Sequence, residues 1–562
     1  MAEQVSGSLI TRKYQNFRGV DFSNRKDEVS LYRSPDALNM WKNYKNSKGR
    51  CVESRPDIEL VKEFADTIFG LFFYTYNNST HRIVHAGTKL YDNDKVIYTN
   101  MAQKKSKAFV YDKSFYIKDG NNYYVYDGTT VKEVEGFIPT TTISRSPNGG
   151  GTIYQDVNLL TGVRKNSFVA DGASKEYIVD SESFDSDYKV RAWVNGKEVT
   201  DFTTTPSTGK ITFGTAPAEP DTVGQDNVII QFRKTVAGYR DKIDKCTLLE
   251  VFDNRVFFAG NPDYPNMVWH SSLEDPSYCS DLDYYPDGTD TSKVKALISG
   301  NNALWVVTDN SAYYHIPTVD DEYGKIYPST HSSINIGAVS TGTNFLDDIV
   351  FFSERGLEGM TSDVTTEQFV KHRSTCVDNK LLNESNYKNV QLEEWEGYLL
   401  AIVDNHIYLA DSRELMTYND HKEYEWWLWQ FDVNIRGSRV DNGKLYLYSD
   451  NKIYSLTNTK EDREVEAYFC TIDDEYTYPQ YMKISNKKGF TVDVNGSEVS
   501  VYVKTDNSNY EFVKKFKPTK GYIVPRVKKK KWKSISLKFY SKKPFELYSA
   551  TLESYVGSYL KK

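Results

Sequence analysis

One pattern recurs along the chain at a nearly constant spacing: an apolar strand, a tight polar turn, and a second apolar strand that carries an aromatic residue. Such a unit has the signature of a β-hairpin. Five copies begin 48, 46, 49 and 46 residues apart. A period in the forties with at least two strands per unit is typical of a propeller blade, which has four strands. The copies are NRVFFAGNPDYPNMVW (254–269), NALWVVTDNSAYYHI (302–316), DIVFFSERGLEGM (348–360), GYLLAIVDNHIYL (397–409) and GKLYLYSDNKIYSL (443–456).

Two earlier copies, HRIVHAGTKLY (81–91) and KSFYIKDGNNYYVY (113–126), precede a gap that is too long for one blade. About 95 residues must be inserted there. The gap has a strand rhythm of its own, with Asn195-Gly196 in VRAWVNGKEV (190–199) giving a strong hairpin signal. We assign residues 139–238 to a small inserted β-sandwich. Seven hairpins predict a β-propeller of about six to eight blades over 66–138 and 239–460.

The charge changes sign near residue 460. Residues 461–562 contain 20 Lys and Arg against 13 Asp and Glu, whereas the rest of the chain has 50 against 64, a net charge of −14. Strand patterns continue to the end, so 461–562 is predicted to be a C-terminal basic β domain. Residues 1–65 lack the blade pattern and are taken as an N-terminal arm with the first strands; RSPDALNMWKN (33–43) is either a short helix or an extended arm. Aromatic residues make up 14% of the chain, which also favours an all-β fold.

Several classes of protein are not expected. No apolar run approaches the roughly 20 residues that cross a bilayer, and the N-terminus has no visible secretory signal. Five cysteines without close pairs argue against a disulfide framework and a CxxC site. We therefore expect no membrane span, a protein made in the cytoplasm, and scattered thiols.

Catalytic motifs are also absent from the sequence, so we expect no enzyme, no cofactor and no metal. His81 and His85 would share a strand face but lie about 13 Å apart, too far for one metal ion. Glu393, Glu394 and Glu396 leave open a glycan-cleaving or glycan-binding propeller, because glycoside hydrolysis uses two carboxylates. Acidic loop residues are more often simply solvated.

Three tryptophans, Trp426, Trp427 and Trp429, concentrate aromatic surface in YEWWLWQF. One interpretation is core packing of a blade strand. The other is a contact with a partner, because tryptophan is enriched at interfaces. Since both faces of such a strand carry an aromatic side chain, one face must be covered by another domain or another subunit.

A lysine run near the C-terminus is the second candidate partner contact. It could follow nucleic-acid phosphates with Trp532 as a stacking platform. It could also be a solvated edge strand that lysine protects from aggregation, or a contact with an acidic protein. The acidic balance of the whole chain favours the last two interpretations. The run consists of Lys528, Lys529, Lys530, Lys531 and Lys533, with Arg526 upstream.

Several segments resemble the tail hub and nozzle (tail stabilisation) family of short-tailed bacteriophages. They are NFRGVDFSN (16–24), SPDALNMWKN (34–43) with GRCVESRPDIELV (49–61), and above all FFAGNPDYPNMVWHSSLEDPSY (257–278). The inserted segment with FVADGASKEYIVD (168–180) is similar to the small sandwich modules of phage structural proteins. No catalytic motif belongs to this family, so the resemblance implies no site residues.

The resemblance implies a structural protein of the virion tail, assembled in the host cytoplasm. Copies would form a homo-oligomeric ring of about six subunits around the channel through which DNA leaves the head. The expected partners are the head–tail connector or adaptor and other tail proteins, with DNA passing through the lumen without sequence recognition. An acidic lumen wall would repel DNA and let it slide, so we expect the −14 body to face the lumen. We expect the basic stretch 481–562 to face a neighbouring subunit or an acidic partner.

Overall fold

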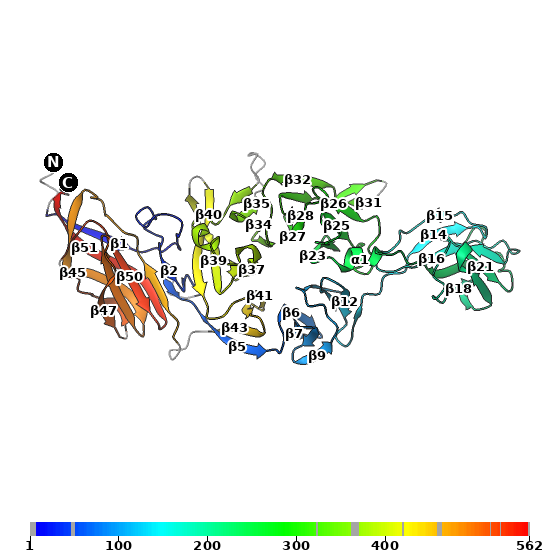
Figure 1. Cartoon of the computed structure of the whole chain (residues 1–562), viewed down its shortest axis with the longest axis horizontal. Coiled ribbons are helices and arrows are strands. Elements are labelled where there is room, and N and C mark those ends of the chain that lie inside the picture. Colours follow the sequence, from blue (N-terminus) through cyan, green and yellow to red (C-terminus); the bar gives the residue numbers. More distant parts are fainter. Residues whose placement is uncertain are drawn as a thin grey trace. The chain divides into compact units, whose positions relative to one another are not determined.

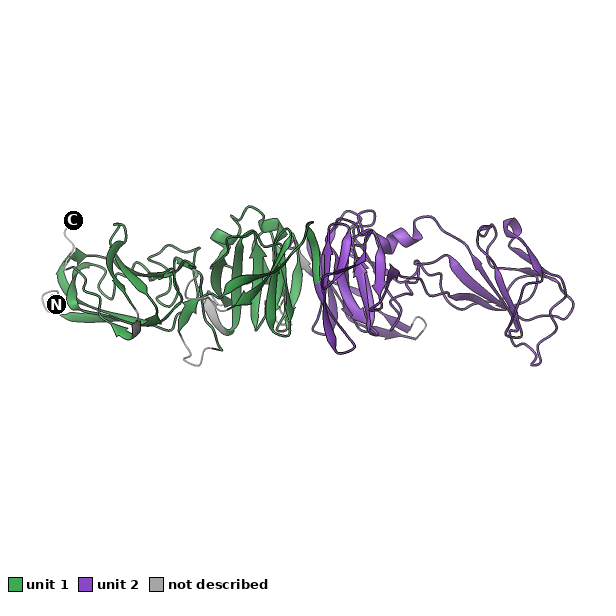
Figure 2. Ribbon diagram, turned by 90° about the horizontal axis from the view of Figure 1, so that it is seen from below, with its two compact units in different colours: residues 1–71, 337–562 green, residues 72–336 purple. Residues whose placement is uncertain are grey.

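The computed structural model describes residues 7–45, 51–321, 324–360, 370–418, 421–457, 464–517, 519–528 and 530–559. Strands make up nearly all of its regular structure (Figure 1). The two α-helices are single turns, α1 (Tyr239–Asp244) and α2 (Asp378–Leu381). The prediction of an all-β protein is confirmed. The chain divides into two compact units, residues 72–336 and residues 1–71 with 337–562 (Figure 2).

Seven four-stranded antiparallel sheets follow one another along the described chain, within the predicted range of blades. Each of the seven predicted hairpins forms the two central strands of one sheet. The first four sheets are β6 (Ile68–Tyr76), β7 (Ser79–Ala86), β8 (Lys89–Asp92), β9 (Lys95–Tyr98); β10 (Lys107–Tyr111), β11 (Ser114–Lys118), β12 (Tyr123–Tyr126), β13 (Val131–Glu133); β23 (Leu248–Phe252), β24 (Arg255–Ala259), β25 (Met267–His270), β26 (Tyr284–Pro286); and β27 (Val294–Gly300), β28 (Ala303–Thr308), β29 (Ser311–His315), β32 (Ser329–Ile334).

The last three sheets belong to the other unit, and the seventh is completed from the opposite end of the chain. Its fourth strand, β5, precedes the first sheet in sequence and pairs antiparallel with β43. These sheets are β33 (Gly342–Phe345), β34 (Asp348–Ser353), β35 (Gly356–Met360), β36 (Val370–His372); β37 (Gln391–Trp395), β38 (Tyr398–Val403), β39 (His406–Tyr418), β40 (His421–Gln430); and β41 (Gly437–Asp441), β42 (Lys444–Tyr448), β43 (Lys452–Thr457), β5 (Asp57–Glu63).

The inserted segment folds around a hydrophobic core of its own, which includes Phe168, Tyr177 and Phe213. The predicted hairpin at Asn195-Gly196 joins β18 to β19, and both residues have the positive φ of a type I′ turn, 49° and 76°. The inserted β-sandwich is therefore confirmed. Its two sheets are β15 (Thr152–Ile153), β14 (Thr140–Arg145), β16 (Val163–Phe168), β22 (Val228–Arg233), β18 (Arg191–Val194), β19 (Lys197–Val199); and β17 (Glu176–Ile178), β21 (Lys210–Phe213), β20 (Phe202–Thr205).

The C-terminal β domain is also a two-sheet sandwich, and four strands from the N-terminal arm complete it. Residues 33–43 are extended, so the short-helix alternative is wrong; β2 and β3 lie there because each pairs with a strand of the sandwich. One sheet contains β3 (Met40–Trp41), β4 (Val52–Ser54), β51 (Phe545–Tyr559), β45 (Tyr481–Gly496), β48 (Thr519–Ile523), β1 (Leu9–Tyr14) and β49 (Lys531–Trp532); the other contains β2 (Ala37–Leu38), β44 (Ala467–Cys470), β50 (Ile535–Ser541), β46 (Val499–Thr505) and β47 (Glu511–Phe516).

The arm also packs against the propeller strand β40. The backbone N–H of Val20 donates to the carbonyl oxygen of Trp426 at 2.8 Å. Gly19 permits this approach, because a Cβ built on it would lie 2.5 Å from the same oxygen and its φ is +80°. Lys42 of the arm forms a 2.7 Å ion pair with Glu425, whose side chain is fully buried. One continuous core therefore joins the arm, the last three blades and the C-terminal sandwich.

Candidate interaction site on the C-terminal sandwich

The lysine run lies on the connection from β48 to β49, at the open side of the sandwich. Side chains alternate along this connection: Ile523, Pro525 and Val527 are buried, whereas Arg526 and Lys528 are exposed. The alternation follows from an extended chain with one face on the core. Lys529 lies outside the described residues. The structure thus presents the cations of the run toward solvent over an apolar base.

Three lysines of the run remain; Lys531 and Lys533 are exposed, Lys530 is half-buried, and two of the three form ion pairs. Lys530 forms an ion pair with Glu511, and Lys533 with Glu475 at 2.9 Å. Lys531 is exposed on β49. The hydrogen bond from Lys530 lowers the pKa of Glu511. Arg526 and Lys528 differ from Lys530 and Lys533, because no described carboxylate forms an ion pair with either of them.

Trp532 does not offer a stacking platform, so that part of the nucleic-acid interpretation is wrong. Its side chain is 0% exposed, and its indole N–H donates to Ser485 Oγ at 2.8 Å. Beside it, the buried ammonium of Lys483 donates to the carbonyl oxygens of Tyr478, Tyr481 and Lys533 at 2.8–3.0 Å. Trp532 is held inside the sandwich because β49 pairs with β45 at this position.

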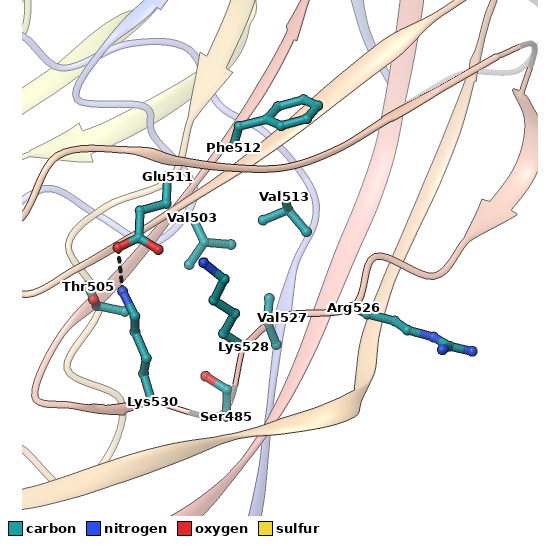
Figure 3. A pocket seen from close by; sticks show the side chains of 10 residues that line it. All are labelled: Ser485, Val503, Thr505, Glu511, Phe512, Val513, Arg526, Val527, Lys528 and Lys530. Atoms are coloured by element: carbon teal, nitrogen blue, oxygen red, sulfur yellow. Dashed lines mark hydrogen bonds and ion pairs between the residues drawn. The ribbon is translucent and has the colours of Figure 1, made fainter.

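A small pocket of about 80 Å³ opens beside the lysine run (Figure 3). Its walls come from both sheets of the sandwich and from the connection. The side chains of Lys528 and Lys530 run toward Glu511, while Arg526 points away from it. Three cations and one carboxylate give the lining a net charge of +2. The lining residues are Ser485, Val503, Thr505, Glu511, Phe512, Val513, Arg526, Val527, Lys528 and Lys530.

Exposed apolar side chains accompany the pocket. Phe512 is 58% exposed on β47, and Tyr522 and Val524 are 76% and 50% exposed on and just after β48. Both β47 and β48 are end strands of their sheets, so they present backbone groups without a neighbouring strand in the described chain. Sequence reasoning missed Glu511 and Phe512, although the basic strand EFVKKF could have indicated an edge. Lysine on an edge strand opposes pairing with the edge of another sheet.

The tryptophan cluster is not a partner contact, so that interpretation is wrong. The side chains of Trp426, Trp427 and Trp429 are at most 1% exposed, because the chain itself covers both faces of β40. Trp41 of the arm packs edge-on against Trp429, with ring centroids 5.2 Å apart. The indole N–H of Trp426 donates to the carbonyl oxygen of Arg373 at 2.9 Å. Core packing, the other interpretation, is what the structure shows.

Two of the three acidic residues on and just after β37 are paired with cations. Glu393 accepts a hydrogen bond from Arg439 at 2.9 Å, and Glu396 forms an ion pair with Lys45. Glu394 follows Glu393 directly on the strand, so the two side chains point to opposite faces. These carboxylates do not face one another across a cleft.

Histidines in the propeller also have local partners. His81 Nδ1 lies 2.8 Å from Asp92, and His85 is buried with its Nε2 3.1 Å from the carbonyl oxygen of Gly87. His372 lies between two carboxylates, 3.2 Å from Glu358 and 2.6 Å from Asp378. Burial opposes protonation, but the hydrogen bonds to these carboxylates outweigh it and raise the pKa of His372 to about 9. A protonated imidazole with both nitrogens engaged is not available as a general base.

No group of three or more metal-ligating side chains occurs among the described residues. No helix in the described part of the chain is both long and apolar enough to cross a membrane. All five cysteines are buried as thiols.

No family model and no curated protein matches this chain. Among solved structures, BamB from Moraxella catarrhalis is 9% identical, with 73% of this chain and 100% of that chain covered and a TM-score of 0.32. PorZ, a surface component of the type-IX secretion system of Porphyromonas gingivalis, is 10% identical, with 93% and 59% covered and a TM-score of 0.25. A glycoside hydrolase is 9% identical, with 87% and 98% covered and a TM-score of 0.21. These likenesses carry no inference about function.

Proposed function

We propose that this chain is a structural protein of a bacteriophage tail, a hub or nozzle subunit that extends the DNA-ejection channel and attaches other tail proteins. The observation that carries the proposal is where the family-like segments lie. Residues 16–24 and 34–43 are the arm segments that tie the C-terminal sandwich to β40. A resemblance concentrated in scaffold segments is expected when what is shared is an architecture.

The third family-like segment is also scaffold. The proline-asparagine loop at 261–266 joins β24 to β25, and its Asn261 side chain donates to the last carbonyl oxygens of α1, those of Asp241 and Lys242, at 3.0 and 2.9 Å. Pro265 accepts the backbone N–H of Val294 at 2.9 Å, which ties the loop to the next sheet. The loop therefore fixes the junction between two blades.

The distribution of charge supports a channel role. The chain outside the basic C-terminal region has a net charge of −14. An acidic surface repels DNA and shortens the lifetime of non-specific contacts, so passage would be fast. In the proposed ring, this body faces the lumen and the basic sandwich faces a neighbour.

The experiment that tests the proposal is a mass measurement on the purified protein and on phage particles that contain it. We expect a closed ring of about six copies, formed by the protein alone or only on the tail. A stable monomer that is absent from particles would contradict the proposal. Glycan turnover or glycan binding by that monomer would instead support the carbohydrate-active alternative.

A further inference from the structure

We propose that the pocket on the C-terminal sandwich receives the acidic loop 218–225 of a second copy of this chain. The inference rests on the proposed function in one respect, because a cyclic ring needs two different surfaces that join head to tail. The pocket is one surface, and the loop at the tip of the inserted sandwich is the other. Neither has an assigned role in the fold described above.

The pocket chemistry selects an acidic, partly apolar occupant. Val503, Val513 and Val527 supply apolar walls, and Phe512 forms an exposed rim. The pocket is small, about 80 Å³, and its apolar walls suit a small branched side chain. The net charge of +2 on the lining favours carboxylates, while Glu511 within it disfavours a row of phosphates.

The loop has the complementary features. Val223 is 99% exposed, so nothing in the described chain covers this apolar side chain. It lies in a turn closed by the N–H of Gln225, which donates to the carbonyl oxygen of Thr222 at 3.1 Å. Glu219 and Asp221, both exposed, precede it, and neither forms an ion pair with a described cation. One apolar tip beside two unpaired carboxylates matches an apolar pocket beside two unpaired cations.

The base of the loop is fixed, which lowers the entropy lost on docking. The buried side chain of Asn227 donates to the carbonyl oxygen of Ala218 at 2.9 Å and to the side-chain oxygen of Asn195 at 3.2 Å. The loop is thus presented in one shape by the inserted sandwich. Val223 would enter the pocket, with Glu219 and Asp221 against Arg526 and Lys528.

A charge-swap experiment on the full-length chain tests the contact. R526E/K528E and E219K/D221K each place like charges together, so each should weaken self-association by at least about tenfold, read by sedimentation velocity over a concentration series. The four substitutions combined restore opposite charges and should recover most of the loss. V223S should weaken association, because it removes the apolar tip without changing the charge of the loop or the pocket. Higher salt should weaken the wild-type contact, since the charges are near the surface.

Matched controls separate the contact from net charge. K487E/K488E changes two exposed lysines of the same sandwich by the same charge as R526E/K528E. E182K/D201K does the same for two exposed carboxylates of the inserted sandwich. Both controls should associate like the wild type. Circular dichroism should show every variant folded, because all of the substituted residues are exposed.

Three results would overturn the inference: a wild-type protein that stays monomeric, single variants that associate normally, or a combined variant that fails to recover. If R526E/K528E instead lost binding to single-stranded DNA, the pocket would belong to a nucleic-acid contact. The proposed function is tested separately, by whether phage particles contain the protein. A ring that persists in particles of the R526E/K528E variant refutes this interface and leaves the tail role intact, whereas absence from wild-type particles refutes the tail role.

Discussion

Replacing Gly19 by alanine should destabilise the unit that contains the arm by about 2–4 kcal/mol. The φ of +80° costs an alanine about 1 kcal/mol. The new Cβ would lie 2.5 Å from the carbonyl oxygen of Trp426, so the arm must move away from β40. Movement weakens two backbone hydrogen bonds, Val20 to Trp426 at 2.8 Å and Ser34 to Gly19 at 2.9 Å. Each contributes about 0.5–1.5 kcal/mol.

A second glycine of the same unit isolates the contribution of the close approach. Gly443 has a φ of +77° but nothing within 4 Å of an added Cβ, so G443A should cost only the conformational strain, about 1 kcal/mol. Urea unfolding followed by tryptophan fluorescence measures both variants, because five of the tryptophans pack around β40 and the arm. Hydrogen exchange should also speed up at the amide of Val20 in G19A alone. Equal destabilisation by G19A and G443A would refute the argument from contact with β40.

Three further predictions concern buried polar groups and the inserted sandwich. The raised pKa of His372 means that its stabilising ion pairs are complete below about pH 6.5 and are lost as the pH rises through about 9. Urea unfolding should show that the wild type loses up to about 3 kcal/mol of unfolding free energy over this range, and that H372Q loses far less. Lys483→Met leaves three buried carbonyl oxygens without their donor and should cost about 1–3 kcal/mol in thermal unfolding, with K487M, at an exposed lysine, as the neutral control. The segment 139–238 has its own core, so it should unfold cooperatively when expressed alone. Tyr177→Ala removes a fully buried ring between Phe168 and Phe213 and should abolish that transition. A wild-type segment that unfolds without cooperativity would contradict this.

The sequence predicted what depends on local pattern. Each hairpin of the propeller combines alternating apolar residues with a tight turn, both of which act over about ten residues, so all seven appear as the central strands of a sheet. The same reasoning located the inserted sandwich, because Asn195-Gly196 carries the dihedral angles that a two-residue turn requires.

Long-range pairing was beyond local pattern. Asn495-Gly496 has the sequence of a hairpin turn, yet the two residues end β45, and the following strand β46 lies in the other sheet. Val494 and Val499 are both buried in the core of the sandwich. The cover over Trp429 comes from Trp41, far away in sequence, so no window around the tryptophans could identify it. The lysine run was noticed as a charge pattern, whereas its pocket depends on Phe512 and Val503, which only the folded sandwich brings beside it.

The pairing of β5 with β43 has a consequence for synthesis on the ribosome. Glu63 ends β5 and Lys452 begins β43, so 389 residues must be made before the partner of β5 exists. At about 5–20 residues per second, the first strands wait about 20–80 s with open edges. The strands β1, β2 and β4 wait longer still, because their partners β44 and β51 follow β43 in the chain. Nascent chains stalled before residue 452 should therefore depend on chaperones that shield strand edges, and maturation of this unit can finish only after β51 has been made.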